Sequence, residues 1–172
     1  MPTLPNPVRN PKATIYIGID PGASGGIAWI EGTEVQAVKM PSTEHDIFDA
    51  LHEIVHPVKY RGAHQPTVHA SIEKVHAMPK QGVSSTFKFG VNYGLLRGML
   101  VALRVPFEEP TPQRWIKRLE IPNKKKSETP TQWKNRLKGR AQQLFPQVKI
   151  TLSTSDALLI AEYTRREKII NT

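Results

Sequence analysis

Hydrophobic and polar positions alternate along some stretches of the chain and recur every three to four residues along others. Residues 14–20, Thr-Ile-Tyr-Ile-Gly-Ile-Asp, are mostly β-branched or aromatic and run into turn residues, which predicts a short buried strand. Gly25 and Gly26 turn the chain into residues 27–30, and a further turn leads into residues 34–39, which alternate as a half-buried strand does. The pattern therefore predicts a three-stranded antiparallel meander.

A helix and a further strand follow the meander. Apolar residues at helical spacing predict a helix over residues 43–56, which Pro57 ends. Residues 67–73 alternate again and end in Glu73. Because a helix connects the meander to this strand, we expect it to run parallel to the first strand, with the carboxyl ends of both at one edge of the sheet. Asp20 and Glu73 could then be neighbours.

The second half of the chain is predicted to be mainly helical. A long helix over residues 84–103 carries three glycines, each of which costs a helix roughly 1 kcal/mol relative to alanine. The glycines are spaced by four residues and so form a stripe along one side of the helix. Such a stripe is explained either by the close approach of a partner helix across a dimer or by packing on the sheet. The glycines are Gly90, Gly94 and Gly98. The other elements are a short last strand over residues 105–109, a helix that Thr111 and Pro112 start, a basic helix over residues 130–145, and a C-terminal helix with Asp156 in its first turn.

These elements predict an α/β protein with a five-stranded mixed sheet, an antiparallel meander plus parallel strands, flanked by helices. The 172 residues suit one domain over residues 14–172. Residues 1–13 hold four prolines and no apolar period, which predicts a disordered N-terminal arm. The chain has no cysteine, no apolar run long enough to span a bilayer and no signal-peptide core, so we expect a soluble cytoplasmic protein without a membrane partner.

Positive charge is concentrated in one segment. The formal net charge is +9, and residues 111–149 carry all of this excess. A charge of this size points to a polyanionic partner, nucleic acid first and anionic membrane second, although a solvated helical face is the simpler explanation of a charge run. Trp115 and Trp133 lie among the basic residues, where they either stack on bases or anchor the core.

Three carboxylates lie at the edges of core elements: Asp20, Glu73 and Asp156. Each alone has a local explanation as a turn or cap residue. Converging without cations, they would repel one another and raise one another's pKa, so such a cluster implies divalent metal. Oxygen ligands select magnesium or manganese, and two such ions can activate a water and stabilise the leaving oxygen in phosphodiester hydrolysis.

The helix over residues 43–56 offers a different metal site. His52-Glu-Ile-Val-His56 matches the H-E-x-x-H pattern of zinc proteases, in which two histidines one turn apart bind zinc. His64 and His69 are within range as a third ligand. The alternative is that both histidines flank the apolar stripe of a surface helix.

The order and spacing of four blocks resemble the RuvC family of Holliday junction resolvases, within the RNase H-like superfamily. The blocks are Ile17-Gly-Ile-Asp20-Pro-Gly, Ile72-Glu73-Lys-Val, Tyr93-Gly-Leu-Leu-Arg97-Gly and Asp156-Ala-Leu-Leu-Ile-Ala-Glu-Tyr-Thr-Arg165. The last block, with Thr111-Pro-Gln-Arg-Trp115 before it, is closest to phage-encoded members, whose site of action is the host cytoplasm. The resemblance covers about residues 14–166.

The resemblance implies an RNase H-like fold and a homodimer, built on the long helix, that binds four-way DNA junctions and nicks two strands symmetrically. It also implies two Mg²⁺ or Mn²⁺ ions in each active site. Asp20 would bridge both ions, Glu73 would bind one of them, and Asp156 would bind the other. These three residues are therefore the candidate catalytic residues.

Two positions depart from the family pattern. Ser153 stands where the family usually has a carboxylate or histidine, so it would bind metal only through water or support a ligand. His76 stands where the family often has an aromatic residue that wedges into the junction. The candidate DNA-binding residues, partly placed by loose alignment to the family, are Lys74, His76, Lys80, Arg114, Lys117, Lys124, Lys125 and Lys126.

Three alternatives remain open at this point. Another RNase H-like nuclease, acting on flaps or on RNA/DNA hybrids, would keep the same metals. Asp20-Pro-Gly also resembles the phosphate loop of actin-like ATPases, but those carry two such domains and this chain has room for one. A protein that binds branched DNA without cutting it would keep the basic segment and need none of the carboxylates.

Overall fold

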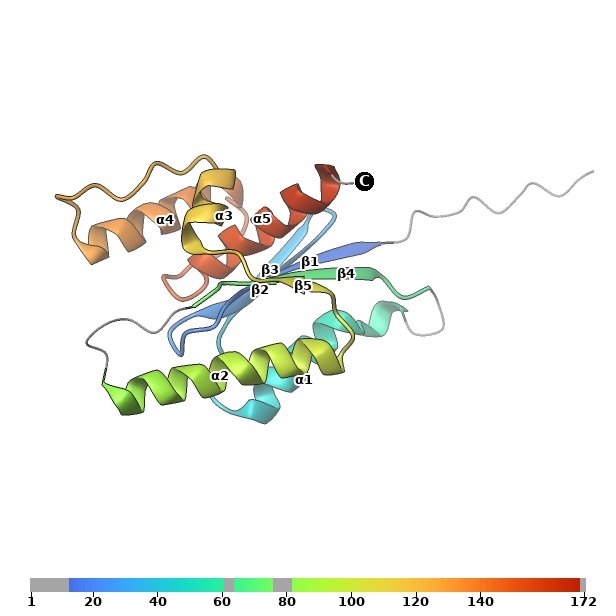
Figure 1. Ribbon diagram of the computed structural model, residues 1–172. Coiled ribbons are helices and arrows are strands. Elements are labelled where there is room, and N and C mark those ends of the chain that lie inside the picture. The colour runs from blue at the N-terminus through green and yellow to red at the C-terminus, as the bar shows by residue number, and fades with distance from the viewer. Residues whose placement is uncertain (1–12, 61–63, 76–81, 171–172) are drawn as a thin grey trace, which may run out of the picture.

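The computed structural model describes residues 13–60, 64–75 and 82–170, and its centre is a five-stranded sheet (Figure 1). The sheet has the order β3-β2-β1-β4-β5. Antiparallel pairing joins β1 to β2 and β2 to β3, whereas β4 runs parallel to β1 and β5 parallel to β4. The strands are β1 (Thr14–Asp20), β2 (Gly26–Glu31), β3 (Glu34–Lys39), β4 (Thr67–Ile72) and β5 (Phe107–Glu108). The predicted mixed sheet is confirmed.

Helices cover both faces of this sheet (Figure 1). They are α1 (Glu44–Val55), α2 (Val83–Ala102), α3 (Pro112–Arg118), α4 (Pro130–Leu144) and α5 (Ser155–Ile170), and η1 (Val58–Tyr60) is a short 3₁₀ helix. Thr43, Thr111 and Thr129 cap α1, α3 and α4 through their hydroxyl oxygens, as the sequence predicts for Thr111. One layer consists of α1 and α2, and the other of α3, α4 and α5 (Figure 1).

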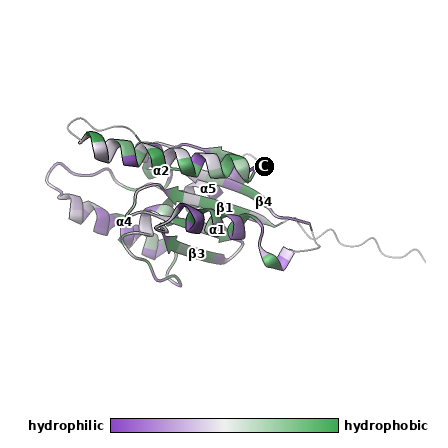
Figure 2. Cartoon of the chain, turned by 90° about the horizontal axis from the view of Figure 1, so that it is seen from below, coloured by the Kyte–Doolittle hydropathy of each residue, from purple (hydrophilic) through white to green (hydrophobic). Residues whose placement is uncertain are grey.

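Each layer buries its own apolar cluster against the sheet. Alternation along β1 directs Ile15, Ile17 and Ile19 into the cluster beneath α1 and α2. The other cluster lies between the sheet and α3–α5 and includes most of the first half of α5. Figure 2 shows the contrast between the largely hydrophobic β1 and the mostly hydrophilic α4.

Gly18 brings α5 directly against β1. A Cβ atom at this position would lie 2.1 Å from the Ala161 nitrogen and 2.2 Å from the Ala157 oxygen, so only glycine permits the contact. The hydroxyl of Thr164 also donates to the Ile17 carbonyl, at 3.2 Å. These contacts place the first turn of α5 at the carboxyl end of β1.

The predicted last strand is shorter than expected. Only Phe107 and Glu108 pair with β4, instead of residues 105–109. Pro106 has no amide hydrogen to donate to a neighbouring strand. The Val105 N–H donates to the Leu100 carbonyl at 2.9 Å, so Val105 closes the end of α2 rather than extending the sheet.

The long helix α2 buries less of its apolar surface than its spacing suggests. Leu96, Met99 and Leu100 are buried, but Phe87 is 71% exposed and Val91 46% exposed. The three glycines face open space, with no described atom within 4 Å of a Cβ built on Gly90, Gly94 or Gly98. Packing on the sheet therefore does not explain the glycine stripe.

Two further sequence predictions concern the N-terminal arm and membrane-spanning helices. The predicted N-terminal arm lies outside the described residues, except for Ala13. None of the helices in the described ranges has the length and apolar character needed to cross a membrane.

Candidate active site

The structure brings the three predicted carboxylates to one edge of the sheet. Asp20 is the last residue of β1, and Glu73 directly follows β4. The backbone N–H of Glu73 donates to the Ile19 carbonyl at 3.0 Å, which holds these two strand ends side by side. Asp156 enters the same edge from the first turn of α5, and its side chain is 6% exposed. Residues from three different elements therefore lie at this edge, and their role as metal ligands stays a prediction.

Burial opposes the negative charge that these residues carry. Burial is the main cause that raises the pKa of Glu73 to about 7, and the nearby charges of Asp20 and Asp156 add to it. Burial also raises the pKa of Asp20, followed by the charge of Asp156. A nearby cation would stabilise the ionised forms of Asp20 and Glu73.

Lys134 supplies one cation at this site. It belongs to α4, and its ammonium group forms an ion pair with the Asp156 carboxylate. Burial lowers the pKa of Lys134, but the charges of Asp156, Asp20 and Glu73 outweigh this effect, and the pKa is raised overall. In the sequence Lys134 is only one member of the basic segment, because nothing local connects it to a carboxylate 22 residues away.

Trp115 orients Glu73. Its side chain is 1% exposed, and its indole Nε1–H donates to Glu73 Oε1 at 3.0 Å. Of the two explanations that the sequence left open for Trp115, the structure therefore supports an anchor in the core and not stacking on bases. Trp133 also packs against the core, and the guanidinium of Arg136 lies 4.5 Å from the centre of its ring.

Three glycines lie in or next to the loop after Asp20. The Gly22 N–H donates to Asp20 Oδ1 at 3.3 Å, and the Gly25 N–H closes the turn on the Gly22 carbonyl at 2.8 Å. A Cβ on Gly25 would lie 2.9 Å from Asp20 Oδ1, and one on Gly26 would lie 2.8 Å from the Ser153 carbonyl oxygen. Ser153 thus lies in the turn before α5, with its backbone beside this loop.

The donor set suits hard divalent ions. Carboxylate oxygens are the ligands that Mg²⁺ and Mn²⁺ prefer, and the ammonium of Lys134 shows that a cation is accommodated against Asp156. Within the described ranges, no three Asp, Glu or His side chains are grouped to hold a single metal ion.

Among the described residues, the zinc-protease alternative lacks a third ligand. His52 and His56 lie one turn apart on α1, with ring centroids 5.0 Å apart. No other His, Asp or Glu of the described chain, including His64 and His69, joins them in a group that could hold a metal. The pair is explained as two histidines on the surface of α1.

Comparison with known proteins identifies the fold. No family model and no curated protein matches the sequence. The structure matches RuvC from Thermus thermophilus with a TM-score of 0.57 and 17% identity, over 92% of this chain and 97% of that one. A structure of T. thermophilus RuvC in complex with a Holliday junction substrate matches with a TM-score of 0.58, 16% identity and the same coverage. The fold is that of RuvC.

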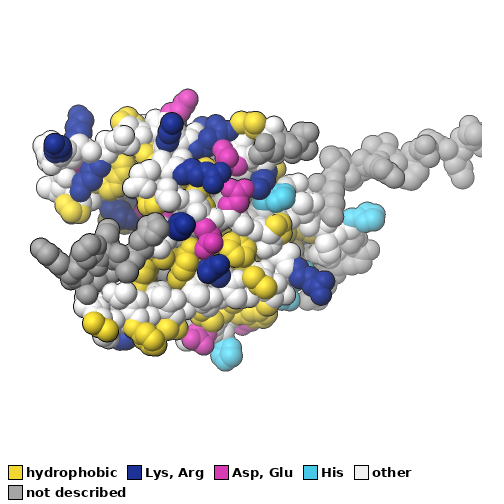
Figure 3. Space-filling view, viewed as in Figure 1, with side chains coloured by type: hydrophobic (Ala, Val, Ile, Leu, Met, Phe, Trp, Pro, Cys, Tyr) yellow, Lys and Arg dark blue, Asp and Glu magenta, His cyan; other side chains and the backbone are white. Residues whose placement is uncertain are grey.

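The RuvC-like fold places the predicted DNA-binding residues in separate groups. Lys74 is exposed directly after Glu73, and the exposed residues 124–126 lie in the loop before α4. Arg114 lies instead over the Tyr163 ring and pairs with Glu108 at 3.4 Å, and Lys117 is exposed on the same helix. Figure 3 shows most Lys and Arg side chains of this face over the α3–α5 layer. His76 and Lys80 lie outside the described residues.

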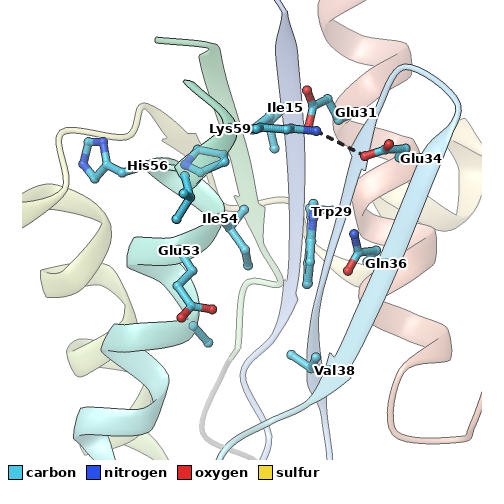
Figure 4. A pocket seen from close by; sticks show the side chains of 13 residues that line it. Ile15, Trp29, Glu31, Glu34, Gln36, Val38, Glu53, Ile54, His56 and Lys59 are labelled. Atoms are coloured by element: carbon cyan, nitrogen blue, oxygen red, sulfur yellow. Dashed lines mark hydrogen bonds and ion pairs between the residues drawn. The ribbon is translucent and has the colours of Figure 1, made fainter. Parts of the chain in front are cut away.

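A hollow of about 610 Å³ lies at the other end of β1 from Asp20. Ile15 and Trp29 line it between the sheet and α1, and Lys59 pairs across its upper edge with Glu31 and Glu34, at 2.7 and 3.2 Å (Figure 4). The carboxylate site is therefore not part of this hollow.

Proposed function

We propose that this protein is a metal-dependent, structure-specific DNA endonuclease that resolves four-way junctions by paired symmetric nicks. The observation that carries the proposal is the group formed by the buried Asp156 and the half-buried Asp20 and Glu73 around the ammonium of Lys134. The RuvC fold and the basic α3–α5 layer, which contributes Lys134 and Asp156 to this group, support it. The junction bound in one of the two matching RuvC structures supports branched DNA as the substrate.

The carboxylates would hold two Mg²⁺ or Mn²⁺ ions, shared through Asp20, with Glu73 on one ion and Asp156 on the other. When bound, such ions activate a water and stabilise the leaving oxygen of a phosphodiester. Hydrogen bonds orient the ligands, because Trp115 donates to Glu73 and the Gly22 N–H donates to Asp20. The Ser155 hydroxyl donates to Asp156 Oδ1 at 3.2 Å. Ser153 would act through water.

The proposed protein is a homodimer that contacts DNA through its basic residues. An exposed apolar stripe on α2, Val83, Phe87 and Val91, runs beside the three open glycines and offers a surface for a second copy. The proposed DNA contacts are Lys74, His76, Lys80, Arg114, Lys117, Lys124, Lys125 and Lys126. Residues 14–172 are proposed to act as one nuclease domain, in the host cytoplasm if the chain is phage-encoded.

The first experiment is a gel assay of the purified protein on a labelled four-way junction, beside linear duplex, flap and RNA/DNA hybrid substrates. Each substrate is tested with and without magnesium or manganese, and with Asp20→Asn. We expect paired symmetric nicks in the junction alone, dependent on metal and on Asp20. If the protein cuts the flap or the hybrid instead, the proposed metal dependence stands and the proposed substrate is wrong. Tight junction binding without any cut would replace the nuclease by a branched-DNA-binding protein.

A further inference from the structure

An ion pair between Glu128 and Arg136 holds the loop that carries Lys124, Lys125 and Lys126, here called the lysine loop (residues 123–129). Arg136 Nε donates to Glu128 Oε1 at 2.9 Å, and Arg136 Nη2 donates to Glu128 Oε2 at 2.8 Å. This is the planar, two-bond geometry that makes arginine–carboxylate pairs both strong and directional. The Glu128 side chain is 12% exposed and that of Arg136 30% exposed, so water screens the pair incompletely.

The same two side chains reach the rest of the loop. Arg136 also donates to the carbonyl of Pro122 at 2.7 Å and to that of Asn123 at 3.1 Å. Glu128 Oε2 accepts in addition from the backbone N–H of Lys125, at 3.2 Å. The face of the guanidinium lies on Trp133, which fixes its orientation on α4. The beginning, middle and end of the lysine loop are therefore all tied to α4.

Attachment to α4 also fixes the loop relative to the carboxylate site. Lys134 lies two residues before Arg136 on this helix and pairs with Asp156. The lysines at positions 124–126 are exposed, while the backbone beneath them is bonded to buried or half-buried groups. A rigid connection thus runs from the exposed lysines to the site where a phosphodiester would be cut.

We propose that Arg136 and Glu128 are positioning residues that hold the lysine loop ready to bind DNA phosphates near the carboxylate site. The inference rests on the proposed function. A loop without this pair would have to lose its backbone freedom on binding DNA, and that entropy would be subtracted from the affinity. A loop that is already ordered avoids the loss.

Replacing Glu128 tests the proposal, because an effect of charge alone and a positioning role predict opposite changes in the affinity for DNA. If only charge mattered, removing an acid from a basic segment would strengthen DNA binding, because fewer negative charges face the phosphates. If Glu128 positions the loop, the same change weakens binding. Gln is close to Glu in shape, but its amide NH₂ would face the N–H groups of Arg136, so Glu128→Gln breaks the two-bond pair while making the net charge more positive.

The experiment measures junction affinity without divalent metal for the wild type, Glu128→Gln, Arg136→Lys and a control, Arg140→Lys. Arg140 lies one turn further along α4, and its hydrogen bonds to Gln143 and to the Leu119 carbonyl are both long, at 3.4 Å. We expect Glu128→Gln and Arg136→Lys to bind about five- to tenfold more weakly than the wild type, and Arg140→Lys to change by about twofold or less. Equal or tighter binding by Glu128→Gln, or an equal loss in the control, overturns the inference.

A second measurement tests the loop without DNA. Limited trypsin digestion, with fragments identified by mass, gives the rate of cleavage after residues 124–126. We expect about five- to tenfold faster cleavage there in Glu128→Gln and an unchanged rate after Lys59, because only the local structure opens. Equal loop cleavage overturns the inference. A wild type that binds no junction would instead overturn the proposed function, and the digestion would still decide whether the loop is held.

Discussion

At the scale of single residues, burial in the candidate site disfavours the charged forms of its carboxyl groups. Asp20, Glu73 and Asp156 come from three different elements, and the pKa values of Asp20 and Glu73 are raised mainly because they are buried. Such carboxyls destabilise the metal-free protein when they ionise, and a bound cation relieves that cost. The ammonium of Lys134 offsets part of this cost, because its charge lowers the pKa of both carboxyls.

Glu73 predicts how the stability of the metal-free protein depends on pH. Its pKa is about 7 in the folded protein, against 4.5 ordinarily. Below pH 4.5 both states hold the proton and nothing is lost. Between 4.5 and 7 the unfolded state releases its proton first, so the free energy of unfolding falls as pH rises, by up to roughly 3 kcal/mol. Urea unfolding with a chelator should therefore show Glu73→Gln gaining stability over the wild type between pH 4.5 and 8. Parallel curves would contradict the raised pKa.

Lys134 predicts a change in metal affinity. Its ammonium pairs with Asp156, so it repels a divalent ion bound to that carboxylate. Lys134→Met should bind Mg²⁺ about fivefold more tightly in a calorimetric titration at about pH 9, well above the pKa of about 7 of Glu73. Lys138→Met removes the same charge one turn further along α4 and serves as the control. Weaker binding by Lys134→Met would mean that the ammonium supports the metal site instead of competing for it.

Sequence patterns located the carboxylates but not the groups that control them. Asp20 and Glu73 end alternating strands and Asp156 opens an apolar helix, so each has a local signal. The Trp115–Glu73 bond joins residues 42 apart, and the Lys134–Asp156 pair joins residues 22 apart. Only the packing of α3 and α4 on α5 and the sheet creates these contacts, and no periodicity within the chain encodes them.

At the scale of elements, the contact between β1 and α5 assembles the site. Gly18 permits the close approach that carries Asp156 to the carboxyl end of β1. The meander and the parallel position of β4 follow from alternation and from connection length, and both were predictable. The short β5 was not, because the Val105 N–H bonds to the end of α2 instead of to a strand.

Gly18→Ala should destabilise the protein strongly. The new Cβ would meet backbone atoms of Ala157 and Ala161 at 2.2 and 2.1 Å, which a flexible side chain could not relieve. We expect a loss of about 3 kcal/mol or more in the free energy of unfolding, measured in urea. Gly139→Ala is the control, because no described atom lies within 4 Å of its Cβ in α4, and it should gain up to about 1 kcal/mol. Equal stabilities would mean that α5 does not lie on β1.

The lysine loop predicts a change in the salt dependence of binding. Replacing Lys124, Lys125 and Lys126 together by Gln should weaken junction binding and lower the slope of log affinity against log salt by up to about 3, roughly one for each phosphate that the loop no longer neutralises. Fluorescence anisotropy at several salt concentrations measures the slope. A slope equal to that of the wild type would show that the loop points away from DNA.

At the scale of the whole molecule, the two helical layers have different surfaces. The α3–α5 layer carries most of the Lys and Arg side chains on the face shown in Figure 3, as expected from the charge of residues 111–149. The α1–α2 layer leaves Phe87 and Val91 exposed. Residues 1–13 as a disordered arm and residues 14–172 as a single domain stay predictions. The glycine spacing was visible in the sequence, but only the structure shows that the monomer leaves these glycines uncovered.

The substitution Gly94→Leu should have different effects in a monomer and in a dimer. No described atom lies within 4 Å of a Cβ at this position, so in a monomer Gly94→Leu meets no clash and stabilises α2 by up to about 1 kcal/mol. If a second copy packs on the glycine stripe, the leucine side chain holds the two helices apart, and sedimentation should show monomers where the wild type gives dimers. Val58→Asp, at a 67% exposed position in η1, should leave the dimer intact. If the wild type is a monomer and Gly94→Leu only raises the melting temperature, the proposed dimer is wrong. The proposal of two symmetric nicks then loses its explanation.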